Sequence, residues 1–551
     1  NFAGTLTDNG LDVDPAYYVQ TSVANQVNLV NTSGLTMRFW DGVAGAKNDN
    51  LITGGDGLWQ ASGGNDNWTE YDGSANAPFT DDAFAVFSGL GGTVTVDATL
   101  GAVTASGMQF ASDAYLITGE DIALVAPESI IRVGDGTANG AAYTATIASN
   151  LTGVGDFVKS DLGTLVLTGT SGVAGGVYVR DGELRLADGG VLTSANGLVG
   201  PDAGNDGVVT ITGSDGVGNA STWTIGTDLT VGYGGTGTLN IADGGKVLSS
   251  GGVVGLDSGG IGEMLVTGTG SSWENSGRIS VGLFGTGTLR IENGATVTSN
   301  DGIVGGSGQG DVVVSGTGSS WTNDAQLNVG SFGAGTMRIE NGASVTSNQG
   351  YIGANADGSV TVTGSGSNWL VTDFSMTVGN VGAGALTIDD GGRVRAEGGF
   401  SLGVATGSSG TVTLLGTPGN RGVLETGQIG AGAGIVNFTM DGGLLRATAD
   451  NDYFFVDFDT RDITLGVNGG VIDTDGHDIG VSPRFVGAGG LAKDGLGTLT
   501  LTGASSYAGA TLVNAGTLIV NGDQSAATGL TTVFSGATLG GNGIIGGNVD
   551  V

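Results

Sequence analysis

The sequence predicts an all-β protein built as a right-handed parallel β-helix, a β-solenoid with about 24 residues per rung. Three observations support this prediction. Glycine supplies 113 of the 551 residues, and a glycine in a helix interior costs roughly 1 kcal/mol relative to alanine. Short Val, Ile, Leu and Thr runs alternate with polar residues between Gly, Asn and Asp turns. A segment of about 48 residues also recurs through the middle of the chain.

The charge balance excludes several classes of partner and site. The chain carries 53 acidic and 17 basic side chains, for a formal net charge of −36. Phosphate backbones and anionic membranes would repel such a surface, so we expect no nucleic-acid partner. The lack of cysteine rules out a disulfide framework and a thiolate metal site. No apolar run is long enough for a transmembrane helix, so we expect no transmembrane segment in this chain.

The N-terminal region, 1–154, is expected to form a Trp-containing cap followed by the first rungs. Trp40, Trp59 and Trp68 crowd into this non-repetitive start. The first rung of a stack exposes an unpaired strand edge, which must be covered or it will pair with another chain. We therefore interpret these three tryptophans as part of a cap.

The central region, 201–398, contains four tandem repeats of about 48 residues, each predicted to form two rungs. Segments such as G-T-G-T-L-R-I-E-N-G-A-T-V at 285–297 recur in every repeat. Leu289 and Ile291 alternate with polar residues, which is the period of a strand with one buried face. Asn293 and the glycine after it then turn the chain, since both tolerate positive φ. Counting the whole chain in this way gives about 23 rungs and a rod on the order of 110 Å.

Two further regions share a second motif, and a region of additional rungs, 399–485, precedes the later copy. The motif reads K-S-D-L-G-T-L-V-L-T-G in 155–200 and K-D-G-L-G-T-L-T-L-T-G in 486–551. Residues 486–520 closely resemble the passenger-associated strand repeat of bacterial autotransporters, and the earlier copy is a more diverged version. In the N-terminal region, F-W-D-G, G-G-D-G-L-W and N-W-T resemble the segment that often precedes the first such repeat.

The resemblance implies a β-helical passenger of type V secretion, similar to autotransporter adhesins. Such a passenger is extracellular or displayed on the surface of a Gram-negative bacterium. The family's precursors carry a signal peptide and an outer-membrane β-barrel translocator. Since the sequence shows neither segment, we expect it to be a processed passenger.

The repeated tryptophans are the most distinctive candidates for ligand contact. Trp223, Trp273, Trp321 and Trp369 would lie two rungs, or about 10 Å, apart on one side of the coil. An exposed ladder of this kind could stack on sugar rings. The alternative, which we favour, is that each indole fills a corner of the core, because packing in a stack also selects regular recurrence.

Weak metal candidates lie in the acidic turn D-T-D-G-H-D. Asp473, Asp475 and Asp478 supply oxygen ligands of the type that Ca²⁺ prefers, although the known calcium-loop spacings are missing. The alternative is solvated turn carboxylates. His477, the only histidine, is interpreted as a turn residue, so we predict no catalytic residue, no bound cofactor and no enzymatic activity.

These observations favour a non-enzymatic, surface-displayed adhesin or interaction rod. Its partner would be a host, cell-surface or glycan ligand. The alternative is a structural subunit of an extracellular fibre or coat, assembled by self-association through the ends of the β-helix. A β-helical polysaccharide-active enzyme is a third reading, but Glu292, Glu340 and Asp389 keep the repeat register, whereas catalytic groups usually interrupt it.

Overall fold

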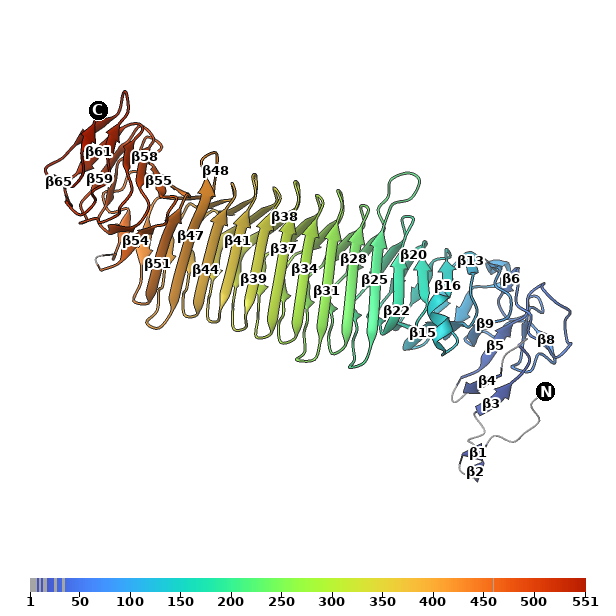
Figure 1. Ribbon diagram of the computed structural model, residues 1–551. Helices are drawn as coiled ribbons and strands as arrows, with labels where there is room; N and C mark the ends of the chain where they lie inside the picture. Colours follow the sequence, from blue (N-terminus) through green and yellow to red (C-terminus); the bar gives the residue numbers. More distant parts are fainter. Residues whose placement is uncertain (1–6, 9–10, 13–16, 24–26, 32–34, 459) are drawn as a thin grey trace. The chain divides into compact units, whose positions relative to one another are not determined.

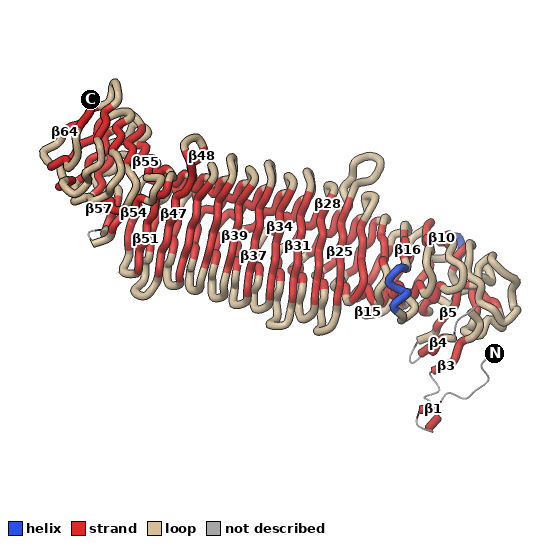
Figure 2. Tube along the Cα trace, viewed as in Figure 1, coloured by secondary structure: helices blue, strands red, loops and turns tan. Residues whose placement is uncertain are grey.

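A computed structural model describes residues 7–8, 11–12, 17–23, 27–31, 35–458 and 460–551. Within these ranges the protein is almost entirely β-strand (Figure 2). The two helical segments there are short 3₁₀ turns, η1 (Ala98–Leu100) and η2 (Ala138–Ala142). Across the described residues, no helix combines the length and apolarity needed to cross a membrane.

The chain divides into two compact units. Unit 1 comprises Asn1–Ser250 with Gly259–Ile261, and unit 2 comprises Gly251–Ser258 with Gly262–Val551. The division falls inside the region predicted to hold the four tandem repeats. In both units successive parallel strands lie side by side along the chain (Figure 1). The predicted β-solenoid is therefore confirmed.

Unit 1 begins with antiparallel pairs, the last of which is joined to the coil because residues 37–39 also pair in parallel with residues 84–86. Two of these are β1 (Thr7–Asp8) with β2 (Leu11–Asp12), and β3 (Tyr17–Gln20) with β4 (Asn28–Asn31). A further antiparallel ribbon joins β5 (Met37–Trp40), β7 (Trp68–Thr69) and β8 (Asn76–Ala77).

The parallel coil of unit 1 has three faces, and we call the face that ends in the seven-residue strands β25 and β28 the long face. The strands of the long face are β6 (Gly57–Gln60), β10 (Thr93–Asp97), β13 (Tyr115–Gly119), β16 (Thr144–Ile147), β19 (Thr164–Leu167), β22 (Asp181–Leu186), β25 (Asp206–Thr212) and β28 (Thr236–Ala242). The strands of the two other faces are β9 (Phe84–Phe87), β11 (Val103–Ala105), β12 (Gly107–Phe110), β14 (Ile122–Leu124), β15 (Glu128–Val133), β17 (Leu151–Gly153), β18 (Asp156–Ser160), β20 (Thr170–Val173), β21 (Val177–Val179), β23 (Val191–Ser194), β24 (Gly197–Val199), β26 (Thr222–Ile225), β27 (Asp228–Val231) and β29 (Lys246–Ser249).

Unit 2 repeats this plan. Its long face contains β34 (Thr286–Glu292), β37 (Gln309–Ser315), β39 (Gly335–Glu340), β41 (Gly358–Thr363), β44 (Ala383–Asp389), β47 (Ser409–Thr417), β51 (Ile435–Asp441), β54 (Asp462–Leu465) and β57 (Arg484–Gly487). The strands of the two other faces include β32 (Ser272–Asn275), β33 (Arg278–Val281), β35 (Thr296–Ser299), β36 (Asp301–Val304), β38 (Ser320–Val329), β40 (Ser344–Ile352), β42 (Asn368–Val371), β43 (Met376–Val378), β45 (Arg393–Ala396), β46 (Phe400–Leu402), β49 (Val423–Thr426), β50 (Ile429–Ala431), β52 (Leu444–Ala447) and β55 (Gly470–Asp473).

The last turns of unit 2 use shorter strands. These strands are β56 (Ile479–Val481), β58 (Leu491–Asp494), β59 (Thr498–Leu501), β60 (Thr511–Val513), β61 (Thr517–Val520), β63 (Thr531–Val533), β64 (Thr538–Gly540) and β66 (Val549–Asp550). A short hairpin, formed by the end of β47 and β48 (Asn420–Arg421), projects from the coil before them.

The strand register gives the length of a rung. Gly287 pairs with Gly310, Gly310 with Gly335 and Gly335 with Gly358, so successive rungs take 23, 25 and 23 residues. Two rungs therefore make one 48-residue repeat, as predicted. The coil in the described part of the chain makes about 19 turns, fewer than the predicted 23. The difference arises because the antiparallel segments of unit 1 contribute no rungs.

The predicted strand and turn chemistry is also observed. On β34, Leu289 and Ile291 are buried while Thr288 and Glu292 lie on the outer side. The turn that follows has φ values of 56° at Asn293 and 87° at the next glycine. Both values lie in the left-handed region, which asparagine and glycine tolerate better than other residues. A turn of this kind, with Asn or Asp followed by Gly, ends β28, β34, β39 and β44, whereas the strands between them on the same face end at Gly-x-Gly.

Candidate functional surface

The four repeated tryptophans lie inside the coil. The side chains of Trp223, Trp273, Trp321 and Trp369 are fully buried. In unit 2 they alternate with valine at one position of the rung, because Val297 pairs with Trp273 and Trp321, and Val345 pairs with Trp321 and Trp369. The exposed ligand ladder is therefore wrong for these residues, and core packing is correct.

Each buried indole needs a polar partner and space. Trp321 Nε1 donates to Ser299 Oγ at 3.1 Å, and Trp369 Nε1 donates to Ser347 Oγ at 3.1 Å. A glycine supplies the space, since a Cβ added to Gly302 would lie 2.9 Å from Cζ2 of Trp321. The polar–Trp–polar alternation of the sequence already indicates the inward direction of these side chains.

The N-terminal tryptophans form an aromatic cluster in unit 1. Trp40, Trp59 and Trp68 are fully buried. The ring centroids of Trp40 and Trp68 are 5.1 Å apart, as are those of Trp59 and Trp68. Phe87 joins the cluster and stacks on Phe110 of the next rung at 4.9 Å. This cluster adjoins the antiparallel ribbon, so a dense aromatic core fills the start of the coil.

An arginine cluster surrounds one buried carboxylate in unit 2. Glu425 is only 2% exposed, although it lies at an outward register position of β49. It accepts hydrogen bonds from Arg393 of the preceding rung and from Arg446 of the following rung, the latter at 3.0 Å. Arg446 also donates to Asp473 at 2.9 Å. Sequence reasoning missed this cluster because its members come from rungs separated by more than twenty residues.

A shallow groove of about 450 Å³ lies beside this cluster. Asn368, Leu370, Arg393, Arg395 and Glu397 contribute to its lining. Each arginine there already has a carboxylate partner, because Arg395 Nε donates to Glu397 at 3.0 Å. The groove therefore has no excess of positive charge.

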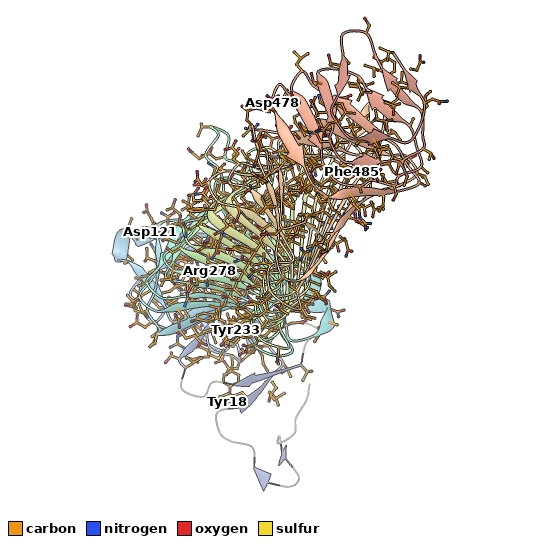
Figure 3. The ribbon with its side chains drawn as sticks, turned by 90° about the vertical axis from the view of Figure 1, so that its left-hand side faces the viewer. Tyr18, Asp121, Tyr233, Arg278, Asp478 and Phe485 are labelled. Carbon is orange, nitrogen blue, oxygen red and sulfur yellow. The ribbon has the colours of Figure 1, made fainter. Side chains whose placement is uncertain are left out.

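The acidic turn predicted as a weak calcium site has a different arrangement. Within the described ranges, no group of three or more His, Asp or Glu side chains is arranged to hold a metal ion. The Asp473 carboxylate accepts from Arg446 and from the backbone N–H of Asp475, at 2.9 Å in each case. Asp478 (Figure 3) instead accepts from the N–H of Thr498 at 2.8 Å. The carboxylates of Asp473 and Asp478 thus make separate contacts with other residues, and calcium binding at this turn stays a prediction.

His477 lies in this turn, where the sequence placed it. Its Nδ1 is 3.1 Å from Asp450 Oδ1, which also accepts from the backbone N–H of Asp478. These hydrogen bonds, that from Asp478 above all, hold the pKa of the Asp450 carboxyl below its usual value. The contacts join two successive turns of the coil, and they give His477 a structural role.

Two buried lysines occupy equivalent positions in the two copies of the K-x-x-L-G-T-L motif. Lys159 pairs with Ile131 below and Val179 above. Lys493 likewise pairs with an isoleucine and a valine, Ile472 and Val513. Both lysine side chains are fully buried.

The ammonium groups bind backbone carbonyl oxygens at a corner of the coil. Lys159 donates to the carbonyls of Ser160 at 3.1 Å and Asp161 at 2.8 Å, and to that of Asp181 in the next rung at 2.8 Å.

Lys493 does the same with Asp494 at 2.8 Å, Gly495 at 2.7 Å and, one rung on, Ala515 at 3.2 Å. Each lysine therefore ties two consecutive rungs together from inside.

Burial lowers the pKa of both lysines. The pKa falls to about 7 for Lys159 and to about 8 for Lys493, because burial penalises the charged form. Nearby carboxylates, with Asp161 the strongest for Lys159 and Asp473 the strongest for Lys493, act in the opposite direction. Alternation of the sequence would have placed both lysines inward, since each follows a buried apolar residue by two positions.

The motif that holds these lysines matches a known family model. A model described as the passenger-associated-transport-repeat matches residues 157–186 and 491–520. The chain carries two passenger-associated-transport repeats. Each repeat contains one of the buried lysines. The resemblance to autotransporter passengers that the sequence indicated is thus supported at both predicted places.

A curated relative supports the same class. Over 208 residues the chain is 46% identical to the adhesin BmaC autotransporter of Brucella suis biovar 1 (strain 1330). The similar region covers 37% of this chain and 6% of that protein. The chain therefore spans a small part of the length of the relative, and it resembles a passenger of the adhesin class.

Exposed aromatic residues are the functional candidates that the sequence analysis missed. Phe284 and Phe332 are 57% and 71% exposed, and both lie at the corner that leads into a long strand of unit 2. Their signal in the sequence was a phenylalanine at 48-residue spacing before the G-x-G-T motif. In unit 1, Tyr233 lies at the corresponding corner and is 38% exposed.

Proposed function

We propose that this chain is the non-enzymatic passenger of an autotransporter and acts as an adhesin at the surface of a Gram-negative bacterium. Its 46% identity with an autotransporter adhesin over 208 residues is the observation that carries the proposal. The two passenger-associated repeats support export to the cell surface. The partner would be a host, cell-surface or glycan ligand.

The architecture is compatible with an adhesin. Its interior is filled by tryptophan, valine and other apolar residues. Outward residues repeat from rung to rung, so one small contact can be presented many times along the coil. Many weak contacts that act together give an avidity that none of them has alone.

Adhesion can be tested with the purified 551-residue chain coupled to beads. We expect saturable retention of the beads on cultured epithelial cells, and competition by the free chain. Beads coated with albumin at the same density serve as the control for nonspecific binding of an acidic protein. Retention no higher than that of albumin beads on every cell type and matrix tested would contradict the proposal.

Two measurements on the purified chain distinguish the adhesin from the fibre subunit and from the polysaccharide-active enzyme. A fibre subunit would sediment as a large species at micromolar concentration, whereas an adhesin passenger would sediment as a single chain. A polysaccharide-active enzyme would release reducing ends from a polysaccharide. Both alternatives remain predictions that these two measurements can test.

A further inference from the structure

The exposed phenylalanines of unit 2 form a regular row. Phe284 lies three residues before Gly287, and Phe332 lies three residues before Gly335. Gly310 pairs with both of these glycines, so the two rings occupy the same corner two rungs apart. With about 4.8 Å between neighbouring strands, their spacing is about 10 Å. Val381, 52% exposed, continues the row two rungs further on.

The backbone holds the row in a fixed position. The N–H of Phe332 donates to the carbonyl of Gly306 at 2.7 Å, and the N–H of Phe284 donates to that of Leu256 at 3.1 Å. Ser307, in the rung between the rings, donates its N–H to Leu283 at 2.5 Å. Binding would therefore require little ordering of the backbone, which favours affinity.

Glycines leave the rings uncovered. Each phenylalanine is followed by a glycine, Gly285 or Gly333, and Gly308 lies in the rung between them. A Cβ at Gly308 would lie 1.9 Å from the carbonyl oxygen of Gly285, and a Cβ at Gly333 would lie 2.1 Å from that of Gly308. The backbones of adjacent rungs approach each other so closely at these glycines that no side chain fits in the strip beside the rings.

The corner that carries the row is almost uncharged. The corner segments 282–286, 305–309, 330–334, 353–357 and 379–383 contain one charged residue, Asp357, in a chain with a net charge of −36. Their other polar side chains are amides and hydroxyls, among them Ser307, Gln309 and Asn355, which are all exposed. Amides and hydroxyls match the hydroxyl groups of a neutral sugar, and the segments contain no lysine or arginine to attract an anionic one.

We propose that this row, which we call the phenylalanine row and define as Phe284, Phe332 and Val381, binds a neutral, extended, β-linked polysaccharide. Alternate sugar rings would stack their apolar faces on the two phenylalanines, since two rungs of the coil match the disaccharide repeat of an extended β-1,4-linked chain. The amides and hydroxyls between the rings would bind the sugar hydroxyls. The inference rests on the proposed adhesin function and specifies its ligand class.

The test uses the purified chain and cellohexaose, with a tri-galacturonate as the anionic comparison, in isothermal titration calorimetry. We expect binding of cellohexaose and none of the anionic sugar. The double variant Phe284→Ala/Phe332→Ala should bind at least about ten-fold more weakly, because both stacking surfaces are lost. Phe374→Ala is the matched control, since Phe374 is 60% exposed on another corner of unit 2, and it should leave the affinity unchanged.

A spacing variant tests the geometry itself. The change Phe332→Ala combined with Ser307→Phe moves the second ring one rung closer, to about 5 Å from the first. This variant keeps two exposed rings but should bind as weakly as the double alanine variant. Circular dichroism and the melting temperature of each variant establish that the fold is retained.

The inference is overturned if the parent chain binds no neutral β-linked hexasaccharide, cellohexaose or mannohexaose, or if the double variant binds as well as the parent. Cell adhesion is measured separately with the same variants. Adhesion by a parent chain that binds neither sugar would leave the adhesin function standing and remove the glycan row. If the parent chain binds neither sugar, loss of adhesion in the double variant that glycosidase treatment of the cells does not reproduce would assign the row to a protein partner instead.

Discussion

The central repeats and the passenger-associated repeats place different kinds of side chain in the interior of the coil. In the central repeats, an indole fills the corner and needs one hydrogen bond, such as that from Trp321 to Ser299. In the passenger-associated repeats, a buried lysine binds three carbonyl oxygens in two rungs at a corner of the coil. The stability of the central repeats therefore depends on the volume of the indole, and that of the passenger-associated repeats depends on the charge and hydrogen bonds of the lysine. The two regions should therefore respond differently to substitution and to pH.

The largest effect should come from volume in the central repeats. Trp321→Ala should lower the free energy of unfolding of the surrounding rungs by about 4 kcal/mol, because it opens a large cavity between Val297 and Val345. Hydrogen exchange followed by mass spectrometry should show the loss in peptides covering 290–350, while distant rungs are unchanged, since stability in a stack is local. Trp321→Phe, which retains most of the volume, should cost less. Equal losses in both variants would contradict the importance of volume here.

The passenger-associated repeats should be sensitive to the removal of one donor. Lys493→Met keeps much of the side-chain volume but leaves the buried carbonyls of Gly495 and Ala515 without the lysine donor. The expected loss at pH 7 is about 3 kcal/mol, since each buried acceptor without a donor costs about 1–3 kcal/mol. Hydrogen exchange in peptides covering 470–520 measures this loss.

The matched control for that variant is Lys246→Met. Lys246 lies at an outward register position of β29 and is partly exposed, so its replacement should change the local stability by less than about 0.5 kcal/mol. If Lys493→Met and Lys246→Met have the same small effect, the buried lysine does not hold the two rungs together.

The pH dependence separates the two designs further. The pKa of Lys493 is about 8 in the folded protein and 10.5 in its unperturbed state. Between these values the unfolded chain binds more protons at this site than the folded chain. Stability of the C-terminal rungs should therefore rise with pH from about 8 to 10.5, by at most about 1.4 kcal/mol per unit. Lys159, with a pKa of about 7, should begin to contribute at lower pH.

The difference in local stability between the parent chain and Lys493→Met, measured against pH by chemical denaturation, isolates this effect from the titration of other groups. The difference should grow above pH 8 and be constant below about pH 7. A difference that falls as the pH rises would reverse the predicted sign. Peptides around Trp321 should show no such lysine-dependent change.

The smallest effect is expected at the outer ion pairs of the central repeats. Arg338 binds Glu340 at 2.5 Å, but the Arg338 side chain is 53% exposed. Arg338→Ala should change stability by less than about 1 kcal/mol, because water and salt screen exposed pairs. A change in melting temperature as large as that of Lys493→Met would show that the outer face contributes as much as the interior.

Some features of this protein followed from the order of its residues. Alternation on strands such as 286–292, the Asn293 turn and the 48-residue spacing together predicted a coil with two rungs per repeat. These features are local, because side-chain direction in a strand and backbone freedom in a turn depend on neighbouring residues. The same alternation also predicts that Trp321 and Lys493 point inward. The exposed tryptophan ladder, which the sequence analysis considered as a ligand site, would have required these indoles to point outward.

Other features depended on residues that only the coil brings together. Glu425 lies at an outward position, yet it is buried because Arg393 and Arg446 approach it from the rungs on either side. Asp473 likewise accepts a hydrogen bond from Arg446, which lies 27 residues away along the chain.

The sequence by itself determined the fold class, the length of the rung and the two passenger-associated repeats, because each is a regular pattern along the chain. The tertiary structure alone decided that the rings of Phe284 and Phe332 are exposed. Trp369 and Phe332 both recur every two rungs, but a glycine opens space in the core for the indole, and stacked glycines leave the phenylalanine ring uncovered. Exposure is a property of neighbours in adjacent rungs, about 24 residues away along the chain, and the spacing of residues in the sequence does not contain it.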